Sequence, residues 1–188
     1  MTAFEYVSVL VAIIVGLGMT HLLVALGQLI HGRDHRSIYW VQLGWAYVLF
    51  VALIVIWWIG FRWRHIEEWN PLLYTFLLAN PAILYLLTVL LFPRDSEPNL
   101  DMRSWFLSRR KPFFALLSLV LVIDVIDSSL KGLDHLRALG APYLAFAGLG
   151  ILGCATAARI ANQGYHAFFV SVAMVATSLW FYLGLGDL

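Results

Sequence analysis

Two carboxylates lie one helical turn apart, as Asp124 and Asp127, within the apolar stretch of residues 112–130. A carboxylate inside such a stretch is expensive to bury, so each one is a candidate functional group. Two negative charges at this spacing repel each other strongly where the dielectric is low, which favours holding a proton or binding a cation. The pair therefore predicts a proton or cation site.

Two structural alternatives for this pair stay open. Asp127 precedes Lys131 by four residues, the spacing of an ion pair at the end of a helix. The pair can also be held by hydrogen bonds to Ser128, to Ser129 or to a neighbouring helix. In both cases the carboxylates would stabilise the fold without handling an ion.

Other polar residues lie at a similar depth in their own apolar stretches. At 1.5 Å per residue, Asp124 lies roughly 9 Å from the nearer end of its stretch. Three further polar residues lie roughly 12–14 Å from the same boundary, namely Asn80, Thr177 and Ser178. We therefore expect a shared polar layer, with Asp124 facing the protein interior and Asn80 as its preferred hydrogen-bond partner.

A histidine deeper in the first apolar stretch, His21, has three possible roles. It can act as a proton relay, as a haem or metal ligand, or as a hydrogen-bond donor between helices. A lone histidine without a second ligand at its own depth does not make a metal site, which favours the third role.

No metal site, cofactor or catalytic residue is expected. His31 and His35 have the spacing of two metal ligands on a helix, but the arginines beside them disfavour a cation. The single cysteine, Cys154, excludes a disulfide or a cysteine-based zinc site within one chain. The sequence also lacks nucleophile-elbow, phosphate-loop, dinucleotide-binding and His-Glu-x-x-His motifs.

The composition places these side chains in a membrane protein. Of the 188 residues, 62% are hydrophobic and only 12% are charged, and the mean hydropathy is +0.83. Ordinary soluble domains are about half apolar and about a quarter charged, so a soluble protein is excluded. The net charge of +1 gives no electrostatic basis for binding nucleic acid.

Six apolar stretches approach or exceed the roughly 20 residues that a helix needs to span a membrane. They predict an all-α fold, a polytopic bundle that forms a single integral membrane domain over residues 1–188. The predicted spans are residues 6–30, 38–61, 72–92, 112–130, 142–158 and 165–186, with residues 93–111 as a surface linker. A Gly-x-Asp-His sequence follows both the first and the fourth stretch. It indicates either two three-helix halves or ordinary loop chemistry.

Small residues recur at every fourth position in two of the stretches. They are Ser8, Ala12, Gly16 and Thr20 in the first stretch, and Gly150, Cys154 and Ala158 in the fifth. Such stripes let helix backbones approach closely within lipid. They predict helix contacts, either inside one bundle or between subunits of an oligomer.

The distribution of basic residues predicts the orientation. Eight of the twelve Lys and Arg residues fall in the first, third and fifth loops, and none lies in the terminal tails. Because short cytoplasmic loops are enriched in Lys and Arg, we expect both termini outside the cytoplasm.

Cysteine labelling in intact cells tests this orientation, once Cys154 has been replaced. Cysteines from Ser96→Cys and Gly164→Cys should be shielded from an impermeant thiol reagent, whereas Asn70→Cys should be labelled. The reverse pattern would place both termini in the cytoplasm.

Several segments together resemble a family of small bacterial multi-pass membrane proteins that has no assigned activity. They are Phe4-Glu5-Tyr6-Val7-Ser8-Val9, Gly16-Leu17-Gly18-Met19-Thr20-His21-Leu22-Leu23, Tyr39-Trp40 and Ile123-Asp124-Val125-Ile126-Asp127. The resemblance implies a bacterial inner-membrane protein of six helices. It implies no substrate, cofactor or catalytic residue.

Two functions fit these observations. The first is a small oligomeric channel or transporter in which the intramembrane carboxylate handles protons or small cations. The second is a non-transporting scaffold or subunit of a larger membrane complex, with lipid binding as one role. An intramembrane enzyme or haem protein using His21 is less well supported, because a second ligand or nucleophile is missing. The expected partners are membrane lipids and further copies or subunits, and not nucleic acid.

Overall fold

The computed structural model describes residues 3–30, 38–60, 71–93, 101–130 and 133–184. These residues form six α-helices and no strand, which confirms the predicted all-α fold. The helices are α1 (Ala3–Ile30), α2 (Trp40–Gly60), α3 (Pro71–Leu91), α4 (Met102–Leu130), α5 (Leu133–Arg159) and α6 (Gln163–Gly184). All six are long and apolar enough to cross a membrane, so the chain is a multi-pass membrane protein.

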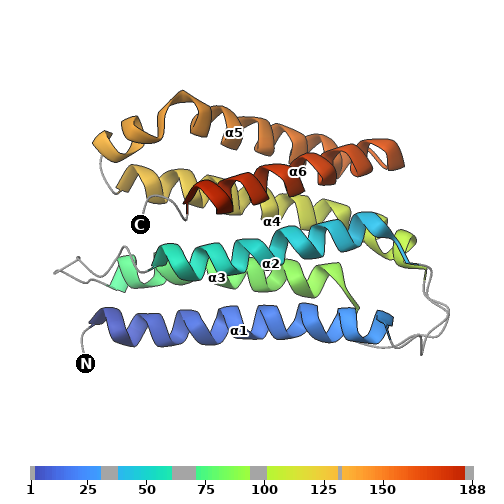
Figure 1. Cartoon of the computed structure of the whole chain (residues 1–188), viewed down its shortest axis with the longest axis horizontal. Coiled ribbons are helices and arrows are strands. Elements are labelled where there is room, and N and C mark those ends of the chain that lie inside the picture. The colour runs from blue at the N-terminus through green and yellow to red at the C-terminus, as the bar shows by residue number, and fades with distance from the viewer. Residues whose placement is uncertain (1–2, 31–37, 61–70, 94–100, 131–132, 185–188) are drawn as a thin grey trace.

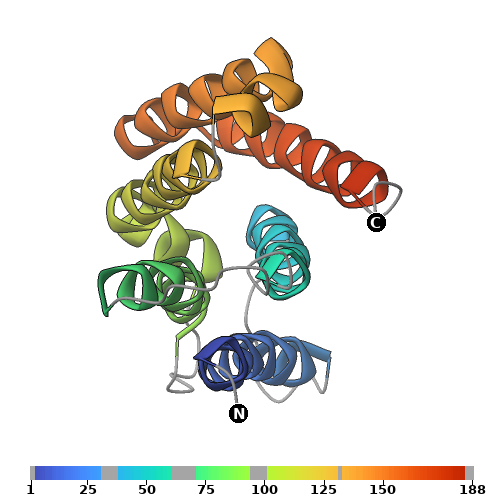
Figure 2. The ribbon, with the colours of Figure 1, turned by 90° about the vertical axis from the view of Figure 1, so that its left-hand side faces the viewer.

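The helices run along one common axis (Figure 1). Helix α1 packs against α2 and α3, α3 also packs against α4, and α4 forms an extensive contact with α5. Helix α6 packs mainly on α2 and extends under α5 (Figure 2). The first turn of α1 and the last turn of α6 lie at the same end of the bundle, as an even number of spans requires.

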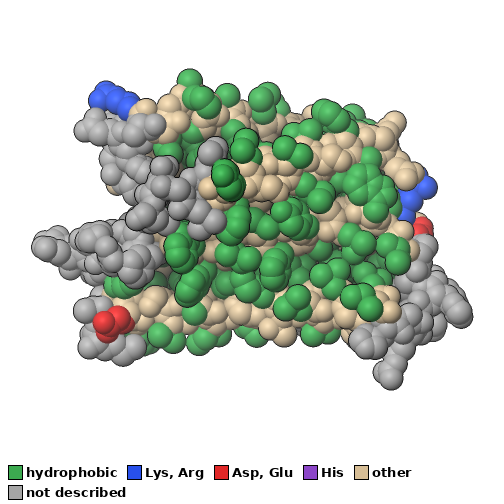
Figure 3. All heavy atoms as spheres, in the orientation of Figure 1, with side chains coloured by type: hydrophobic (Ala, Val, Ile, Leu, Met, Phe, Trp, Pro, Cys, Tyr) green, Lys and Arg blue, Asp and Glu red, His purple; other side chains and the backbone are tan. Residues whose placement is uncertain are grey.

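The outer surface of the bundle suits a lipid environment. Large apolar side chains point outwards, for example Leu149 and Val175, which are 68% and 69% exposed. On the face shown in Figure 3, hydrophobic side chains cover the middle, and the coloured charged groups lie toward the two ends. Backbone groups in lipid must be satisfied within the chain, which is why apolar segments of this length form helices.

The predicted linker is too long. Helix α4 begins at Met102 instead of residue 112, so only the first part of residues 93–111 connects the helices. Asp101 caps this helix: its carboxylate accepts hydrogen bonds from the backbone N–H groups of Arg103 and Ser104, each at 3.2 Å. An aspartate in this position stabilises a helix start. Phe106 holds the part of α4 before residue 112 against the core, because its side chain is only 2% exposed.

Helix α5 contains a kink that the predicted span of residues 142–158 did not include. Gly140 has φ 72° and ψ −178°, a left-handed backbone conformation that favours glycine. Pro142 follows two residues later, and a proline cannot donate the hydrogen bond that would continue the preceding turn. The kink sets the direction in which the following residue, Tyr143, enters the bundle.

An aromatic cluster fills the bundle where α2, α4 and α6 begin. The cluster comprises Trp45, Phe106, Phe113, Phe114, His166 and Phe169, all of them in ring contacts. Trp45 lies at its centre, with ring centroids of three phenylalanines at 5.5–5.6 Å. This end of the bundle is therefore tightly packed.

Candidate functional site: an intramembrane cavity

A cavity of about 1160 Å³ lies between the helices, toward the end where α1 begins and α6 ends. All six helices contribute to its wall, which is mostly apolar. The side chains with hydroxyl, amide or carboxylate groups in this wall are Ser8, Asn80, Asp124, Asp127, Tyr143 and Thr177. The volume is above the usual range of about 300–1,000 Å³ for small-molecule pockets, so the cavity can hold a sizeable ligand.

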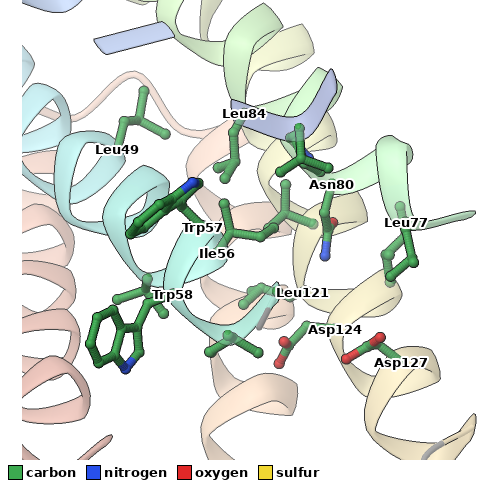
Figure 4. A pocket seen from close by; sticks show the side chains of 18 of the residues that line it. Leu49, Ile56, Trp57, Trp58, Leu77, Asn80, Leu84, Leu121, Asp124 and Asp127 are labelled. Atoms are coloured by element: carbon green, nitrogen blue, oxygen red, sulfur yellow. The ribbon is translucent and has the colours of Figure 1, made fainter. Parts of the chain in front are cut away.

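The carboxylates of α4 point into this cavity. In Figure 4, Asp124 and Asp127 lie on one side together with Asn80 of α3, whose side chain points toward them. Trp57 and Trp58 of α2 lie across the cavity from them. The structure thus brings Asn80 of the expected polar layer to the same space as the two carboxylates.

Asp124 accepts a hydrogen bond from α5, a helix that the sequence did not indicate as the source of its partner. The Tyr143 hydroxyl donates a hydrogen bond to Asp124 Oδ2 at 2.7 Å, and it lies 3.0 Å from Ser128 Oγ. Because the tyrosine proton goes to the carboxylate, the Ser128 hydroxyl donates to the tyrosine oxygen. Asn80, the partner expected from the sequence, borders the same cavity, and its Oδ1 is buried without a hydrogen-bond partner among the described residues.

Sequence reasoning missed Tyr143, although a signal existed. Helices α4 and α5 are joined by a very short connection, so they must pack as an antiparallel pair, as their extensive contact shows. Residues near the end of α4, such as Ser128, then face residues near the start of α5. The kink at Gly140 adds the turn that brings the tyrosine to Asp124.

The remaining candidates lie in different places. Thr177 of α6 lines the cavity with the carboxylates. Ser178 does not: its hydroxyl lies 2.8 Å from the Tyr47 hydroxyl and donates to the Met174 carbonyl oxygen at 2.7 Å, so it joins α6 to α2. His21 lies on α1 outside the cavity wall.

Two groups of sequence candidates fall partly or wholly outside the described residues. The predicted ion pair of Asp127 involves Lys131, and the possible ligand pair His31 and His35 lies in the first loop; these three residues are outside the described ranges. Within the described ranges, no group of three or more His, Cys, Asp or Glu side chains is arranged to hold a metal ion.

The two stripes of small residues differ in their surroundings. On α5, a Cβ placed at Gly150 would lie 2.8 Å from Leu121 of α4, Cys154 is 1% exposed and Ala158 packs against the core. On α1, Ser8 and Ala12 border the cavity, and Ala12, Gly16 and Thr20 are exposed. The α5 stripe therefore packs within the chain, and part of the α1 stripe lies on its outer surface.

The cavity combines an apolar wall with two carboxylates, an amide and hydroxyl groups. The arrangement offers acceptors for a proton or a positively charged group.

Comparison of the chain with protein families, curated proteins and solved structures finds no match.

Proposed function

We propose that the chain is a small membrane transporter in which Asp124 binds a proton or small cation inside the cavity. The single observation that carries the proposal is that the cavity, bordered by all six helices, reaches this carboxylate. An intramembrane carboxylate is costly unless its charge is neutralised, paired or hydrated, and transporters use such groups as ion sites.

The surroundings of Asp124 support reversible binding. The Tyr143 hydroxyl stabilises the negative form of the carboxylate through its hydrogen bond of 2.7 Å. Asp127, one turn away, lines the same cavity. Its negative charge repels that of Asp124, so both carboxylates are ionised together only when a cation is bound. The hydrogen bond from Tyr143 and the repulsion from Asp127 act on Asp124 in opposite directions. A site that must both bind and release an ion requires such a balance.

The proposal places the protein in a bacterial inner membrane with both termini outside. Support comes from the described basic residues at the opposite end of the bundle from the cavity, namely Arg103, Arg109, Arg110, Lys111 and Arg159. Such a cluster favours the cytoplasmic side. The cavity then lies toward the outer side, and the exposed part of the α1 stripe is available for contact with a further copy of the chain.

A scaffold is the second candidate, and one observation favours it. The chain of hydrogen bonds from Ser128 through Tyr143 to Asp124 joins α4 to α5. In a non-transporting subunit, joining these two helices would be the only role of the Asp124 carboxylate. The two candidates therefore differ in what Asp124→Asn should change.

Proton flux into proteoliposomes, driven by a membrane potential and followed with an enclosed pH-sensitive dye, separates them. We expect Asp124→Asn to reduce flux to the level of protein-free liposomes while its elution profile in detergent stays unchanged. Infrared difference spectroscopy should show a protonated carboxyl band near neutral pH that Asp124→Asn removes.

Glu5→Gln is the matched control, because Glu5 is an exposed carboxylate near the same end that does not line the cavity. It should keep wild-type flux and the carboxyl band. If Asp124→Asn leaves both flux and the band unchanged but lowers the melting temperature, the scaffold is correct and the transporter is wrong.

A further inference from the structure

The cavity is long and has an apolar part suited to an aliphatic chain. Its wall follows α2 from Val48 to Gly60, which at 1.5 Å per residue corresponds to roughly 18 Å along the bundle. Toward the aromatic cluster the wall is aliphatic, with Leu49, Leu84 and Leu117 from three helices. Such a surface packs well against methylene groups and offers little to a hydrated ion.

The other part of the cavity carries the negative charge. None of the described residues in the wall is Lys, Arg or His, so its formal charges, on Asp124 and Asp127, are both negative. The Asn80 side chain points toward the same space, with its amide nitrogen nearest the carboxylates (Figure 4). The two carboxylates are therefore the acceptor groups that a ligand with N–H donors would meet.

Aromatic rings border this charged part. Trp57 and Trp58 line the cavity on the side opposite the carboxylates (Figure 4). Tyr143 and Trp180 also line it, with their ring centroids 6.0 Å apart. Electron-rich ring faces attract cations, most strongly where water is partly excluded.

We propose that the cavity binds an amphiphilic organic cation, an ammonium group that carries one long aliphatic chain. The ammonium group lies beside Asp124 and Asp127, and the chain extends along α2 toward the aromatic cluster. Phosphate headgroups of anionic lipids are disfavoured by the two carboxylates, and a bare metal ion gains nothing from the apolar wall. This inference rests on the proposed role of Asp124 as a cation-binding carboxylate and names the class of its cargo.

Binding of radiolabelled dodecylammonium to the whole protein in phosphatidylcholine nanodiscs tests the inference. We expect saturable binding above that of empty nanodiscs, displaced by unlabelled dodecylammonium. Dodecanol has the chain without the charge, and butylammonium has the charge on a short chain. Each should compete at least about tenfold less well, because each makes only part of the contacts.

Two variants address the two parts of the cavity. Asp124→Asn removes a charge, and Ala52→Phe adds bulk to the wall contributed by α2; each should weaken binding at least about tenfold. Their matched controls are Glu5→Gln and Ala145→Phe, at exposed positions outside the wall, and both should bind as the wild type does. If Asp124→Asn does not fold, Asp127→Asn provides the same comparison.

Three results would overturn the inference: wild-type binding no greater than that of empty nanodiscs, unchanged affinity in Asp124→Asn, or dodecanol competing as well as dodecylammonium.

The infrared measurement distinguishes the failure of this inference from the failure of the proposed proton binding. A carboxyl band from Asp124 without dodecylammonium binding would refute the cargo and leave proton binding intact. Specific binding without that band would support the cargo and refute proton binding.

Discussion

The Trp45→Ala variant is expected to lose about 3 kcal/mol of unfolding free energy, the low end of the range for large aromatic residues in soluble cores. Trp45 is 1% exposed, and its ring contacts Phe113 and Phe114 of α4 and Phe169 of α6. Its removal therefore loosens three helices at once. Lipid is as apolar as the core, so the loss comes from packing contacts and not from hydrophobic transfer. Titration of detergent-solubilised protein with sodium dodecyl sulfate measures it.

Trp45→Phe is the matched control at the same position. The indole Nε1 is buried and has no hydrogen-bond partner within the described residues, so its removal leaves no acceptor unsatisfied. A phenyl ring keeps much of the contact area, and we expect a loss of about 1 kcal/mol. Equal losses in the two variants would mean that ring packing at Trp45 does not hold these helices together.

The helices could be predicted from the sequence because a membrane-spanning helix needs only length and apolarity. Their packing could not, because helices surrounded by lipid are apolar on every side. Leu22 and Leu23 illustrate the problem: they are chemically identical neighbours, yet the first is 0% and the second 55% exposed. No amphipathic pattern distinguishes the inward face from the outward face.

The first half of α4 shows a different limit. Its basic residues and Pro112 predict a linker, because a proline is typical of helix starts and charges are typical of loops. In the structure Pro112 lies inside the helix, and the Arg109 guanidinium lies over the Trp105 ring at 3.6 Å from its centroid. A charged side chain that stacks on an aromatic ring of its own helix is compatible with a helix end beyond the apolar core.

Part of the candidate site could be predicted, since polar residues are rare in apolar segments and each one is conspicuous. Asp124, Asp127, Asn80 and Thr177 were identified in this way and border one cavity. Tyr143 was missed because aromatic residues are common near the ends of membrane helices, and only the contact between α4 and α5 gives it a partner. Depth along a helix determines which residues share a layer, whereas rotation about the helix axis determines which of them meet.

The two ends of the bundle differ in how their side chains pack. Large rings fill the space between α2, α4 and α6 at one end of the bundle, with Phe106 and His166 fully buried. Toward the other end, α2 presents Ala52 and Val55 to the interior, and α1 presents Ser8 and Ala12. These short side chains border the cavity together with the rings of Trp57, Trp58 and Trp180. We therefore expect substitutions at the aromatic end to affect folding more than the binding proposed for the cavity end.

Gly153→Ala is expected to destabilise the protein by about 1–3 kcal/mol, although alanine is the better helix former. A Cβ at this position would lie 2.6 Å and 2.8 Å from two ring atoms of Phe169. Phe169 cannot move aside easily, because its ring packs against Trp45, Phe114 and Tyr165. The Tyr165 hydroxyl also donates to the Gly153 carbonyl oxygen at 2.9 Å, so a shift of α5 would break a contact with α6.

Gly148→Ala, on the same helix, gives the same gain in helix propensity without the clash, since no atom lies within 4 Å of a Cβ placed there. It should be neutral or stabilising by up to about 1 kcal/mol. Melting temperatures of the two variants in one detergent, compared with wild type, make the measurement, and only Gly153→Ala should melt earlier. If both variants shift in the same direction by the same amount, intrinsic propensity decides the outcome, and the close approach of α5 to α6 at Gly153 contributes nothing to the stability of the bundle.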